Sequence, residues 1–315
     1  MALPSVVAGD WGTSRLRLFL CDDGGEILAR ADGPGVAAVG GPFPQIFESL
    51  VAPWESRHGA LPAVLCGMVG SNIGWVQAPY VACPALPAKI IGGCIPLRAG
   101  RVRIVPGVRC ENRLGAPDFM RGEETQILGA LTLEPALRRG AHLLCLPGTH
   151  TKWVLLKEGI IEEFLTVPTG ELYAALRDHS VLVGNDFRRQ EVTGGGAFEE
   201  GLKRFGEFPQ VPVLHRLFEC RSRLLSGELA AAGAAAFLSG LLIAEDVGGA
   251  LHLYANGPSA RSVYLIGAPA LTGLYASALE HESCAARQLD GAAASLAGLI
   301  RVHQHNASQV ESSAV

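Results

Sequence analysis

The amino-acid sequence predicts a duplicated α/β architecture, and three observations carry that prediction. An apolar strand, a turn containing Gly and Thr, and a second strand occur near the start of the chain and again near its middle. Each of these units is followed by helices and strands in alternation, which is typical of α/β folds. The chain also has 315 residues, which is more than a single hydrophobic core usually organises. Of these residues 49% are hydrophobic and 18% are charged.

The first half of the chain is expected to begin with three antiparallel strands. The run Leu3 to Ala8 is apolar, and Leu16, Leu18 and Leu20 alternate with other residues, as in a strand with one buried face. A Gly/Pro-rich loop from 67 to 87 follows the fourth strand. The expected elements are strands at 3–10, 15–21, 25–31, 64–66 and 102–105 and a helix at 45–54.

The second half is expected to repeat this order with more helices. At 123–133, Ile127, Leu128 and Leu131 share one helical face, and acidic residues in the first turn suit the helix dipole. The expected elements are strands at 143–146, 153–156, 160–166 and 262–266 and helices at 123–133, 170–179, 198–205, 214–225, 229–246 and 269–279.

A domain boundary is expected in the polar segment 106–117, which begins with Pro106-Gly107 and is predicted to connect the two domains. The predicted division is an N-terminal domain at 1–115, a C-terminal domain at 116–300 and a polar, disordered tail at 301–315.

The composition also limits the partners and the location of the protein. A net charge of −4 without a Lys/Arg run argues against nucleic acid or an anionic membrane as main partner. The apolar run 229–244 is rich in Ala and Gly and predicts a buried helix, and the N-terminus does not read as a secretory signal. Eight cysteines without a C-x-x-C pair favour reduced thiols in the cytoplasm, and nine histidines without ligand spacing predict no structural metal.

Two turns are the candidate phosphate-binding elements. One is the segment 10–14, DWGTS, and the other is the segment 147–152, PGTHTK; each follows an apolar strand. Backbone N–H groups in such turns form a concave anion site, and hydroxyl groups add donors. Ordinary hairpin turns, which Gly and Thr also serve, are the alternative.

The sequence resembles the 2-keto-3-deoxygalactonate kinases (2-dehydro-3-deoxygalactonokinases), a family within the actin-like ATPase and sugar-kinase superfamily. The resemblance extends from about residue 5 to about residue 285 and rests on segments that occur in one order. These segments are 10–17 (DWGTSRLR), 67–75 (GMVGSNIGW), 120–126 (MRGEETQ), 146–153 (LPGTHTKW) and 169–172 (TGEL). The segment 265–268, LIGA, together with the two turns, looks like the ATP-binding pattern of the superfamily.

This resemblance implies two ribonuclease-H-like domains around a central nucleotide and substrate cleft. It also implies phosphorylation of the 6-hydroxyl of 2-dehydro-3-deoxy-D-galactonate by ATP with Mg²⁺, in galactonate catabolism. The implied partner is a small sugar acid, with neither nucleic acid nor membrane, and a homodimer is one arrangement that the sequence allows.

Three acidic residues are the catalytic candidates that the resemblance implies. Asp10 stands where the superfamily places a carboxylate that faces Mg²⁺ through water, and Mg²⁺ takes few protein carboxylates. Its alternative role is to cap a turn. Related carbohydrate kinases open a helix with Gly-Asp before the second phosphate turn, and here that place holds Gly122-Glu123-Glu124. We therefore expect Glu123 as the general base, with Glu124 second, although first-turn glutamates also suit the helix dipole.

The nucleotide is expected to meet both turns and the end of the last strand. Lys152 would add a charge at the phosphates or else be a solvated lysine at a strand edge. Arg17, between Leu16 and Leu18, needs a phosphate or a structural carboxylate as partner. The remaining nucleotide-binding candidates are Gly12, Thr13, Ser14, Gly148 and Thr149 for the phosphates and Gly267 and Ala268 for adenosine. The last two depart from the double glycine usual there.

The acceptor is expected to meet the Gly-rich loop and two helix starts. Ser71, Asn72 and Trp75 offer polar groups and an exposed aromatic face, with a plain surface loop as the alternative. Arg121 can bind a carboxylate through two hydrogen bonds. Thr169 and Glu171 begin a helix whose amides can face an anion or a hydroxyl.

Other functions remain open on these residues alone. The enzyme could act on another sugar or sugar acid, such as 2-keto-3-deoxygluconate, because epimers differ by one hydroxyl orientation. A chaperone-like or actin-like ATPase keeps the fold without sugar chemistry. A nicotinamide-dependent oxidoreductase needs G-x-G-x-x-G after a strand, a spacing that Gly194-Gly195-Gly196 lacks.

Overall fold

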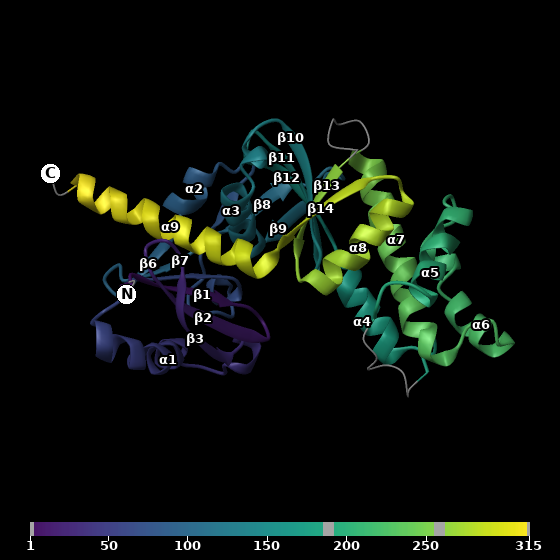
Figure 1. Ribbon diagram of the computed structural model, residues 1–315, viewed down its shortest axis with the longest axis horizontal. Coiled ribbons are helices and arrows are strands. Elements are labelled where there is room, and N and C mark those ends of the chain that lie inside the picture. The colour runs from purple at the N-terminus through teal and green to yellow at the C-terminus, as the bar shows by residue number, and fades with distance from the viewer. Residues whose placement is uncertain (1–2, 185–191, 255–261, 314–315) are drawn as a thin grey trace. The chain divides into compact units, whose positions relative to one another are not determined.

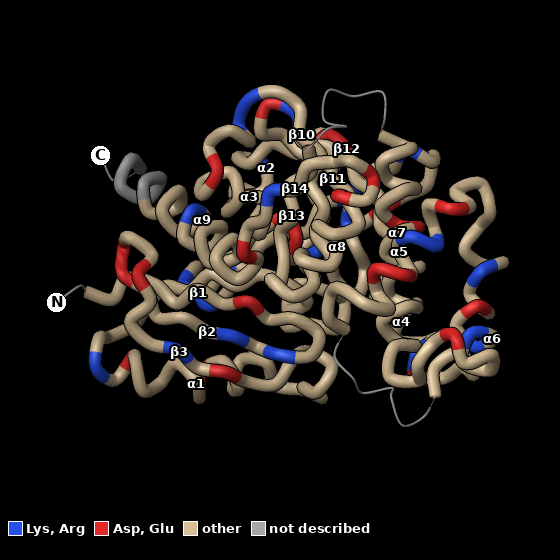
Figure 2. The backbone as a smooth tube through the Cα atoms, turned by 45° about the vertical axis from the view of Figure 1, so that its right-hand side comes forward, with Lys and Arg blue, Asp and Glu red and all other residues tan. Residues whose placement is uncertain are grey.

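The structure is a computed structural model that describes residues 3–184, 192–254 and 262–313 (Figure 1). Its contacts divide the chain into two compact units, each assembled from separate stretches of sequence. Unit 1 comprises Met1–Gly140, Leu156–Phe164 and Gly291–Val315, and unit 2 comprises Ala141–Leu155 and Leu165–Asp290. Acidic and basic residues are interspersed along the backbone of both units (Figure 2).

The larger sheet of unit 1 has six strands in the order β3-β2-β1-β4-β7-β6. Its first three strands are antiparallel, whereas β1, β4 and β7 run parallel, because helical crossovers connect them. The bounds are β1 (Val6–Trp11), β2 (Arg15–Cys21), β3 (Ile27–Pro34), β4 (Ala63–Cys66), β6 (Ile95–Leu97) and β7 (Val102–Ile104), with helices α1 (Phe43–His58), α2 (Pro87–Gly92), α3 (Glu123–Leu133) and α9 (Gly291–Ser313).

The apolar face of this sheet packs on α1. Trp11 is fully buried there, donates its indole N–H to the Pro34 carbonyl at 3.0 Å and contacts the Phe43 ring at a centroid distance of 5.4 Å. Leu16 and Leu18 of β2 are also fully buried, as the alternating pattern predicts. Buried contacts therefore hold both β1, before the first candidate turn, and β2, after it.

The sheet of unit 2 repeats this arrangement. Its order is β12-β11-β10-β13-β14, and β10, β13 and β14 are parallel. The connections from β10 to β11 and from β11 to β12 are short, so these neighbouring strands are antiparallel. The same order in both sheets confirms the predicted duplicated α/β fold. The bounds are β10 (Ala141–Leu146), β11 (Thr151–Lys157), β12 (Ile160–Val167), β13 (Ser262–Gly267) and β14 (Ala285–Asp290), with helices α4 (Thr169–His179), α5 (Ala197–Glu207), α6 (Glu219–Ser226), α7 (Ala234–Tyr254) and α8 (Pro269–His281).

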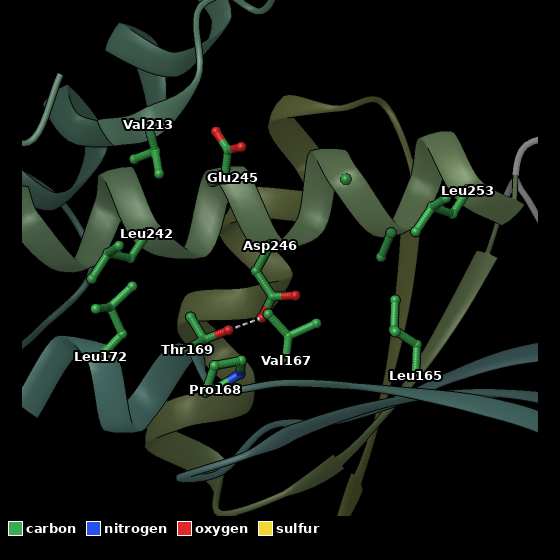
Figure 3. Close-up of a pocket in the computed structure, with 12 residues that line it drawn as sticks. Leu165, Val167, Pro168, Thr169, Leu172, Val213, Leu242, Glu245, Asp246 and Leu253 are labelled. Atoms are coloured by element: carbon green, nitrogen blue, oxygen red, sulfur yellow. Dashed lines mark hydrogen bonds between the residues drawn. The ribbon is translucent and has the colours of Figure 1, made fainter. Parts of the chain in front are cut away.

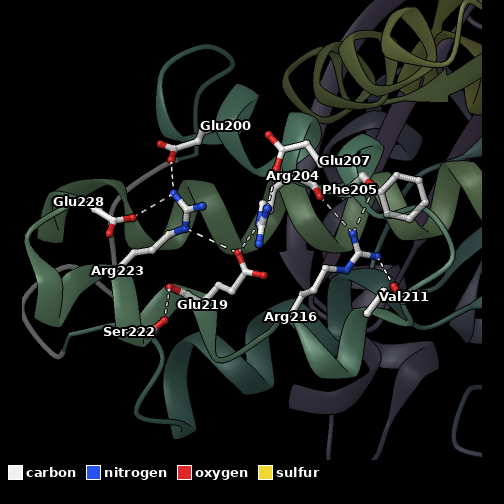
Figure 4. Close-up of polar contacts among 10 residues, drawn as sticks. All are labelled: Glu200, Arg204, Phe205, Glu207, Val211, Arg216, Glu219, Ser222, Arg223 and Glu228. Atoms are coloured by element: carbon white, nitrogen blue, oxygen red, sulfur yellow. Dashed lines mark hydrogen bonds and ion pairs between the residues drawn. The ribbon is translucent and has the colours of Figure 1, made fainter.

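The long insertion between β12 and β13 is helical. Arg204 pairs with Glu207 and Glu219, and Arg223 pairs with Glu200, which ties α5 to α6 (Figure 4). Partly exposed pairs contribute little singly, so their effect depends on forming a network. The fully buried Phe198 of α5 and Phe237 of α7 supply apolar contacts in the same insertion.

Helix α7 is the central helix of this insertion. By length and composition the stretch Ala231–Tyr254 could cross a membrane, since an 18-residue window within it has a mean hydropathy of 1.5, but 72% of that window is buried inside the protein. The helix begins at Ala234 rather than at the expected residue 229, because residues 231–233 form a short 3-10 turn. It is the buried core helix that the sequence predicts.

The unit boundaries differ from the predicted division at residue 115. Segment 106–117, expected to be a crossing, contains β8 (Gly107–Glu111) and leads into β9 (Pro117–Met120). With β5 (Tyr80–Ala82) these strands form a three-stranded sheet in the order β5-β8-β9. Strands this short carry too little alternation to be recognised by pattern.

The C-terminal segment also differs from expectation. Residues 301–313, expected to be a disordered polar tail, continue α9 as a helix. Leu299 and Val302 are buried, and the Gln304 side chain donates to the Asp23 carbonyl at 2.9 Å. One apolar face among polar residues therefore holds the helix on unit 1.

Helices α3 and α9 approach closely because each carries a glycine at their contact. A Cβ on Gly129 would lie 1.8 Å from the Ala294 carbonyl oxygen, and one on Gly298 would lie 2.1 Å from the Thr125 carbonyl oxygen. Backbone atoms cannot move aside as a flexible side chain can.

We predict that Gly129→Ala lowers the free energy of unfolding by about 2 kcal/mol or more, because the new methyl group overpacks this contact. Chemical denaturation measures the change. Gly273→Ala in α8 is the matched control, because a Cβ there meets no atom within 4 Å, and alanine favours a helix by about 0.5–1 kcal/mol. Equal stability of the two variants would contradict the proposed constraint.

Candidate active site

The first candidate turn, between β1 and β2, is a tight hairpin with an exposed tip. The Gly12 N–H donates to the Arg15 carbonyl at 2.9 Å, so this donor is already used within the turn. Thr13 and Ser14 are exposed. Sequence reasoning missed Gly35, which lies against the turn so closely that a Cβ would be 2.2 Å from the Ser14 carbonyl carbon.

Asp10 and Arg17 form an ion pair at the carboxyl end of β1. They are register partners on β1 and β2, and Arg17 Nη2 lies 2.5 Å from Asp10 Oδ2. The partner that Arg17 requires is thus a carboxylate in this structure. A Cβ on Gly67, which follows β4 with φ of +89°, would lie 3.3 Å from Asp10 Oδ1, so the loop after β4 also reaches Asp10.

The start of α3 brings two glutamates to the same end of the sheet. Gly122 has φ of +109°, and a Cβ there would lie 3.6 Å from the Gly67 Cα atom. Glu124 is fully buried, and its carboxylate accepts hydrogen bonds from the Gly122 N–H at 2.7 Å and the Thr125 hydroxyl at 3.0 Å. Glu123 is only partly buried and accepts from the Arg121 N–H at 3.1 Å.

Burial gives Glu124 unusual acid–base properties. Loss of solvation, together with the neighbouring Glu123, raises the pKa of Glu124 to about 8, although its hydrogen bonds act in the opposite direction. Burial also raises the pKa of the Cys66 thiol, which senses the charges of Asp10 and Glu124. Asp10, Cys66 and Glu124 therefore belong to one cluster at the carboxyl ends of β1 and β4.

The Arg121 side chain is fixed beside the Gly-rich loop. Its Nη2 donates to the Ala78 carbonyl at 2.8 Å, and its guanidinium carbon lies 4.4 Å from the centre of the Tyr80 ring. A Cβ on Gly70 would lie 2.8 Å from Nη1. Among the described residues, Nε and Nη1 are buried without a hydrogen-bond partner. An anion is the natural partner for two such donors.

The other residues expected to bind the acceptor lie differently. Asn72 is exposed, but Ser71 is buried, and its hydroxyl accepts from the Ile73 N–H at 3.3 Å. Trp75, expected to present an exposed face, is half-buried because its ring packs on Phe47 at 5.7 Å. An aromatic ring in a Gly-rich loop thus serves the core at least in part.

The second candidate turn, between β10 and β11, is held by the start of α4. The Glu171 N–H donates to the Thr149 carbonyl at 2.9 Å, and the Glu171 carboxylate lies 2.7 Å from His150 Nε2. A Cβ on Gly170 would lie 2.4 Å from the Gly148 carbonyl oxygen. Gly148 and Thr149 are therefore brought together with Glu171, and only glycine at 170 permits the contact.

Asp246 is the buried residue that connects the elements around this turn. Its carboxylate accepts from the Trp153 indole N–H at 2.8 Å and from the Tyr275 hydroxyl at 2.6 Å. It also accepts from the Thr169 hydroxyl at 2.5 Å (Figure 3). The Tyr275 hydroxyl also lies 2.8 Å from Thr151 Oγ1. Burial raises the pKa of Asp246, and these hydrogen bonds oppose the rise.

Sequence reasoning missed Asp246, although one signal was present. It is a carboxylate in a helix that is otherwise largely apolar, and a buried charge requires hydrogen-bond partners. Those partners include Thr169, so Asp246 holds its hydroxyl, whereas the expectation for this helix start concerned its amides. Thr169 and Asp246 also line an apolar groove, together with Leu165, Val167 and Leu172 (Figure 3).

Lys152 and the two residues expected to bind adenosine, Gly267 and Ala268, differ in exposure. Lys152 is buried rather than solvated, and its Nζ donates to Thr166 Oγ1 at 2.9 Å. Because side chains alternate along β11, Lys152 lies on the face opposite to Thr151 and Trp153. At the end of β13, Gly267 is buried beside Pro147, and Ala268 is exposed at the start of α8. The carboxyl ends of β10 and β13 thus adjoin, where α/β sheets commonly bind ligands.

The fold and these turns define the class of the protein. The fold is that of the actin-like ATPases and sugar kinases, with a turn that contains Gly and Thr after the first strand of each sheet. One solved structure with this fold, the activator of the 2-hydroxyisocaproyl-CoA dehydratase from Clostridium difficile with bound ADPNP, aligns with a TM-score of 0.51 at 12% identity. That alignment covers 97% of each chain.

Within this class, the chain belongs to the 2-keto-3-deoxy-galactonokinase family, whose model matches residues 10–302. It is 39% identical over 298 residues to a Rhizobium meliloti (strain 1021) protein named "Probable 2-dehydro-3-deoxygalactonokinase DgoK1", covering 93% of this chain and 94% of that one. It is 34% identical over 294 residues to the 2-dehydro-3-deoxygalactonokinase of Escherichia coli (strain K12), covering 93% and 95%. A crystal structure from Sinorhizobium meliloti, also described as a 2-dehydro-3-deoxygalactonokinase protein, aligns with a TM-score of 0.84 at 36% identity, covering 95% and 98%.

The raised pKa of Glu124 predicts a pH dependence of stability. Its folded-state pKa of about 8 exceeds the ordinary value of 4.5, so between these values folding takes up a proton. The free energy of unfolding therefore falls as pH rises from 5 to 8, by up to about 1.4 kcal/mol per pH unit from this group. Glu124→Gln, which stays neutral, gains stability relative to wild type over this range in denaturation experiments at fixed pH.

The matched control is Glu280→Gln, on an exposed position of α8, which keeps the pH dependence of the wild type. Parallel stability curves for wild type and Glu124→Gln between pH 5 and 8 would show that Glu124 is ionised in the folded protein.

Proposed function

We propose that this chain transfers the γ-phosphoryl group of ATP to the 6-hydroxyl of 2-dehydro-3-deoxy-D-galactonate. The observation that carries the proposal is the cluster at the carboxyl end of the unit 1 sheet. There Asp10, the Glu123-Glu124 helix start and the underpartnered Arg121 guanidinium come from segments that the family pattern also contains. A metal-facing carboxylate, a base and an anion site are the parts that phosphorylation of an acidic sugar requires.

Unit 2 supplies the turn that we assign to the phosphates. The start of α4 contacts Gly148 and Thr149, and Asp246 in turn holds the start of α4 through Thr169. We infer that these contacts restrict the conformation of the turn. Gly267 and Ala268, where β13 meets α8, remain our candidates for the adenosine end. Phosphoryl transfer depends mainly on positioning, so a rigid turn is an advantage.

The two glutamates are assigned different roles because their burial differs. Glu124 is neutral near pH 7 and fully buried, so it is unsuited to accept a proton and instead holds the start of α3. Glu123, which is partly exposed on the same turn, is our candidate for the base that takes the proton of the acceptor hydroxyl.

Asp10 is the residue that we assign to Mg²⁺. Its side chain is 18% exposed, and one carboxylate oxygen faces Arg17, which suits contact with the ion through water better than direct coordination. Among the described residues no group of three or more His, Cys, Asp or Glu side chains could enclose a metal. Bound Mg²⁺ would neutralise charge on the phosphates, while Arg17 keeps the Asp10 carboxylate in place.

We predict that ADP release depends on an acidic acceptor. With ATP and Mg²⁺, the wild type releases ADP stoichiometrically with 2-dehydro-3-deoxygalactonate, less with its gluconate epimer, and little with neutral sugars or without acceptor, in a coupled assay. Arg121→Gln raises KM for the acid about ten-fold or more and leaves KM for ATP unchanged, because a charge-assisted hydrogen bond is lost.

Arg287→Gln is the matched control, since Arg287 also lies over a tyrosine ring, that of Tyr264 in unit 2. Acceptor-independent ADP release would instead support an ATPase, and activity on neutral sugars alone would exclude the role of Arg121.

We predict that Glu123→Gln lowers kcat about 100-fold or more with KM for both substrates nearly unchanged, because the amide cannot accept the proton. Steady-state kinetics with ATP and Mg²⁺ measure the effect. Glu111→Gln, at an exposed position of β8, is the control with wild-type turnover. Near-normal turnover of Glu123→Gln would remove Glu123 from the mechanism.

A further inference from the structure

Two of the eight cysteines differ from the rest in exposure. Cys83 and Cys110 are partly exposed, whereas the other cysteines are buried. Buried thiols act as small hydrophobic groups, and oxidants reach them poorly. The buried set is Cys21, Cys66, Cys94, Cys145, Cys220 and Cys284.

The two partly exposed cysteines are neighbours across two strands of unit 1. In the parallel pair β5 and β8, Val81 faces Val108 and Ala82 faces Arg109, so the next register pair is Cys83 and Cys110. The Cys83 N–H continues the ladder by donating to the Arg109 carbonyl at 2.8 Å. Neighbouring strands lie about 4.8 Å apart, which is within the Cα separation that a disulfide spans.

The side chains of the pair also interact directly. The Cys83 thiol donates a hydrogen bond to the Cys110 sulfur, which lowers the pKa of Cys110 and raises that of Cys83. The Cys110 sulfur also lies 3.2 Å from the Phe164 carbonyl oxygen. Cys110 is thus the better nucleophile, and Cys83 lies beside it as the second thiol.

We propose that Cys83 and Cys110 are a redox-active pair that peroxide converts reversibly to a disulfide. The Cys110 thiolate attacks one oxygen of hydrogen peroxide, the O–O bond breaks, and hydroxide leaves and takes up the thiol proton as water. The resulting sulfenic acid is attacked by the Cys83 sulfur, which forms the S–S bond, and the hydroxyl leaves with the Cys83 proton as a second water. Two thiols are oxidised and one peroxide is reduced to two waters.

The position of the pair links it to the acceptor side of unit 1. Strand β5 carries Tyr80, whose ring lies against the Arg121 guanidinium, and β8 pairs with β9, which ends at Met120 just before Arg121. A disulfide fixes the Cys83 and Cys110 side chains to one another, and the resulting local change in β5 and β8 reaches Tyr80, three residues before Cys83 and beside Arg121. This consequence rests on the proposed function, because it assigns Arg121 to the acidic acceptor.

Peptide mapping of the full chain tests the modification without any assay of activity. After treatment with hydrogen peroxide, we expect a Cys83–Cys110 linked peptide that dithiothreitol releases. Cys83→Ser is expected to stop at a Cys110 sulfenic acid that a dimedone probe traps, and Cys110→Ser to give neither product. Cys284→Ser, a buried control in unit 2, keeps the linked peptide. Oxidation of the buried cysteines before this pair, or trapping of Cys83 rather than Cys110, would overturn the assignment.

Kinetics of the reduced and oxidised protein test the link to Arg121. We expect the disulfide form to show a several-fold higher KM for the sugar acid, an unchanged KM for ATP, and full recovery with dithiothreitol. Cys110→Ser should be insensitive to the same peroxide treatment. An unchanged KM for the acid in a fully linked sample would overturn this link. Failure of the proposed function is distinguishable, because the reduced protein would then fail to phosphorylate the acid at all.

Discussion

Each unit depends on one buried acidic side chain: Glu124 holds the start of α3 itself, whereas Asp246 of α7 joins the start of α4 to β11 and α8. In unit 1 Glu124 accepts from the backbone of Gly122 and from Thr125, and in unit 2 Asp246 accepts from Trp153, Thr169 and Tyr275. Burying such a group without partners costs several kcal/mol, so each carboxylate specifies which donors surround it. The starts of α3 and α4 are positioned as a consequence of satisfying these acceptors, and α4 in turn contacts the second candidate turn.

A second constraint is that backbone segments approach each other closely at the two turns, and glycine is required there. Gly35 lies under the first turn, and Gly170 lies against the second, at distances that leave no room for a Cβ atom. Both contacts bring a distant segment against the tip of a hairpin, which a hairpin alone would not require. The two turns are therefore held by similar means, although the segments that hold them are unrelated in sequence.

The repeated topology could be predicted from the sequence because it depends on local patterns. The first strands, the turns and α3 follow from alternation, Gly and Thr placement and first-turn acids. The short strands β5, β8 and β9 could not be predicted, since their stability comes from pairing with each other. The partners of Asp246 and the contact of Gly35 join residues far apart in sequence, and no spacing signals them. The burial of Lys152 likewise depends on Thr166 of the neighbouring strand.

The adjacent glutamates show how one turn of helix can separate two chemical roles. Two carboxylates next to each other disfavour double ionisation, and the one with less solvent keeps its proton. Here burial selects Glu124 as the neutral member. Under the proposed function, the two glutamates that stand where related kinases have a single aspartate take separate roles: Glu124 supports the helix start, and Glu123 is our candidate for proton transfer.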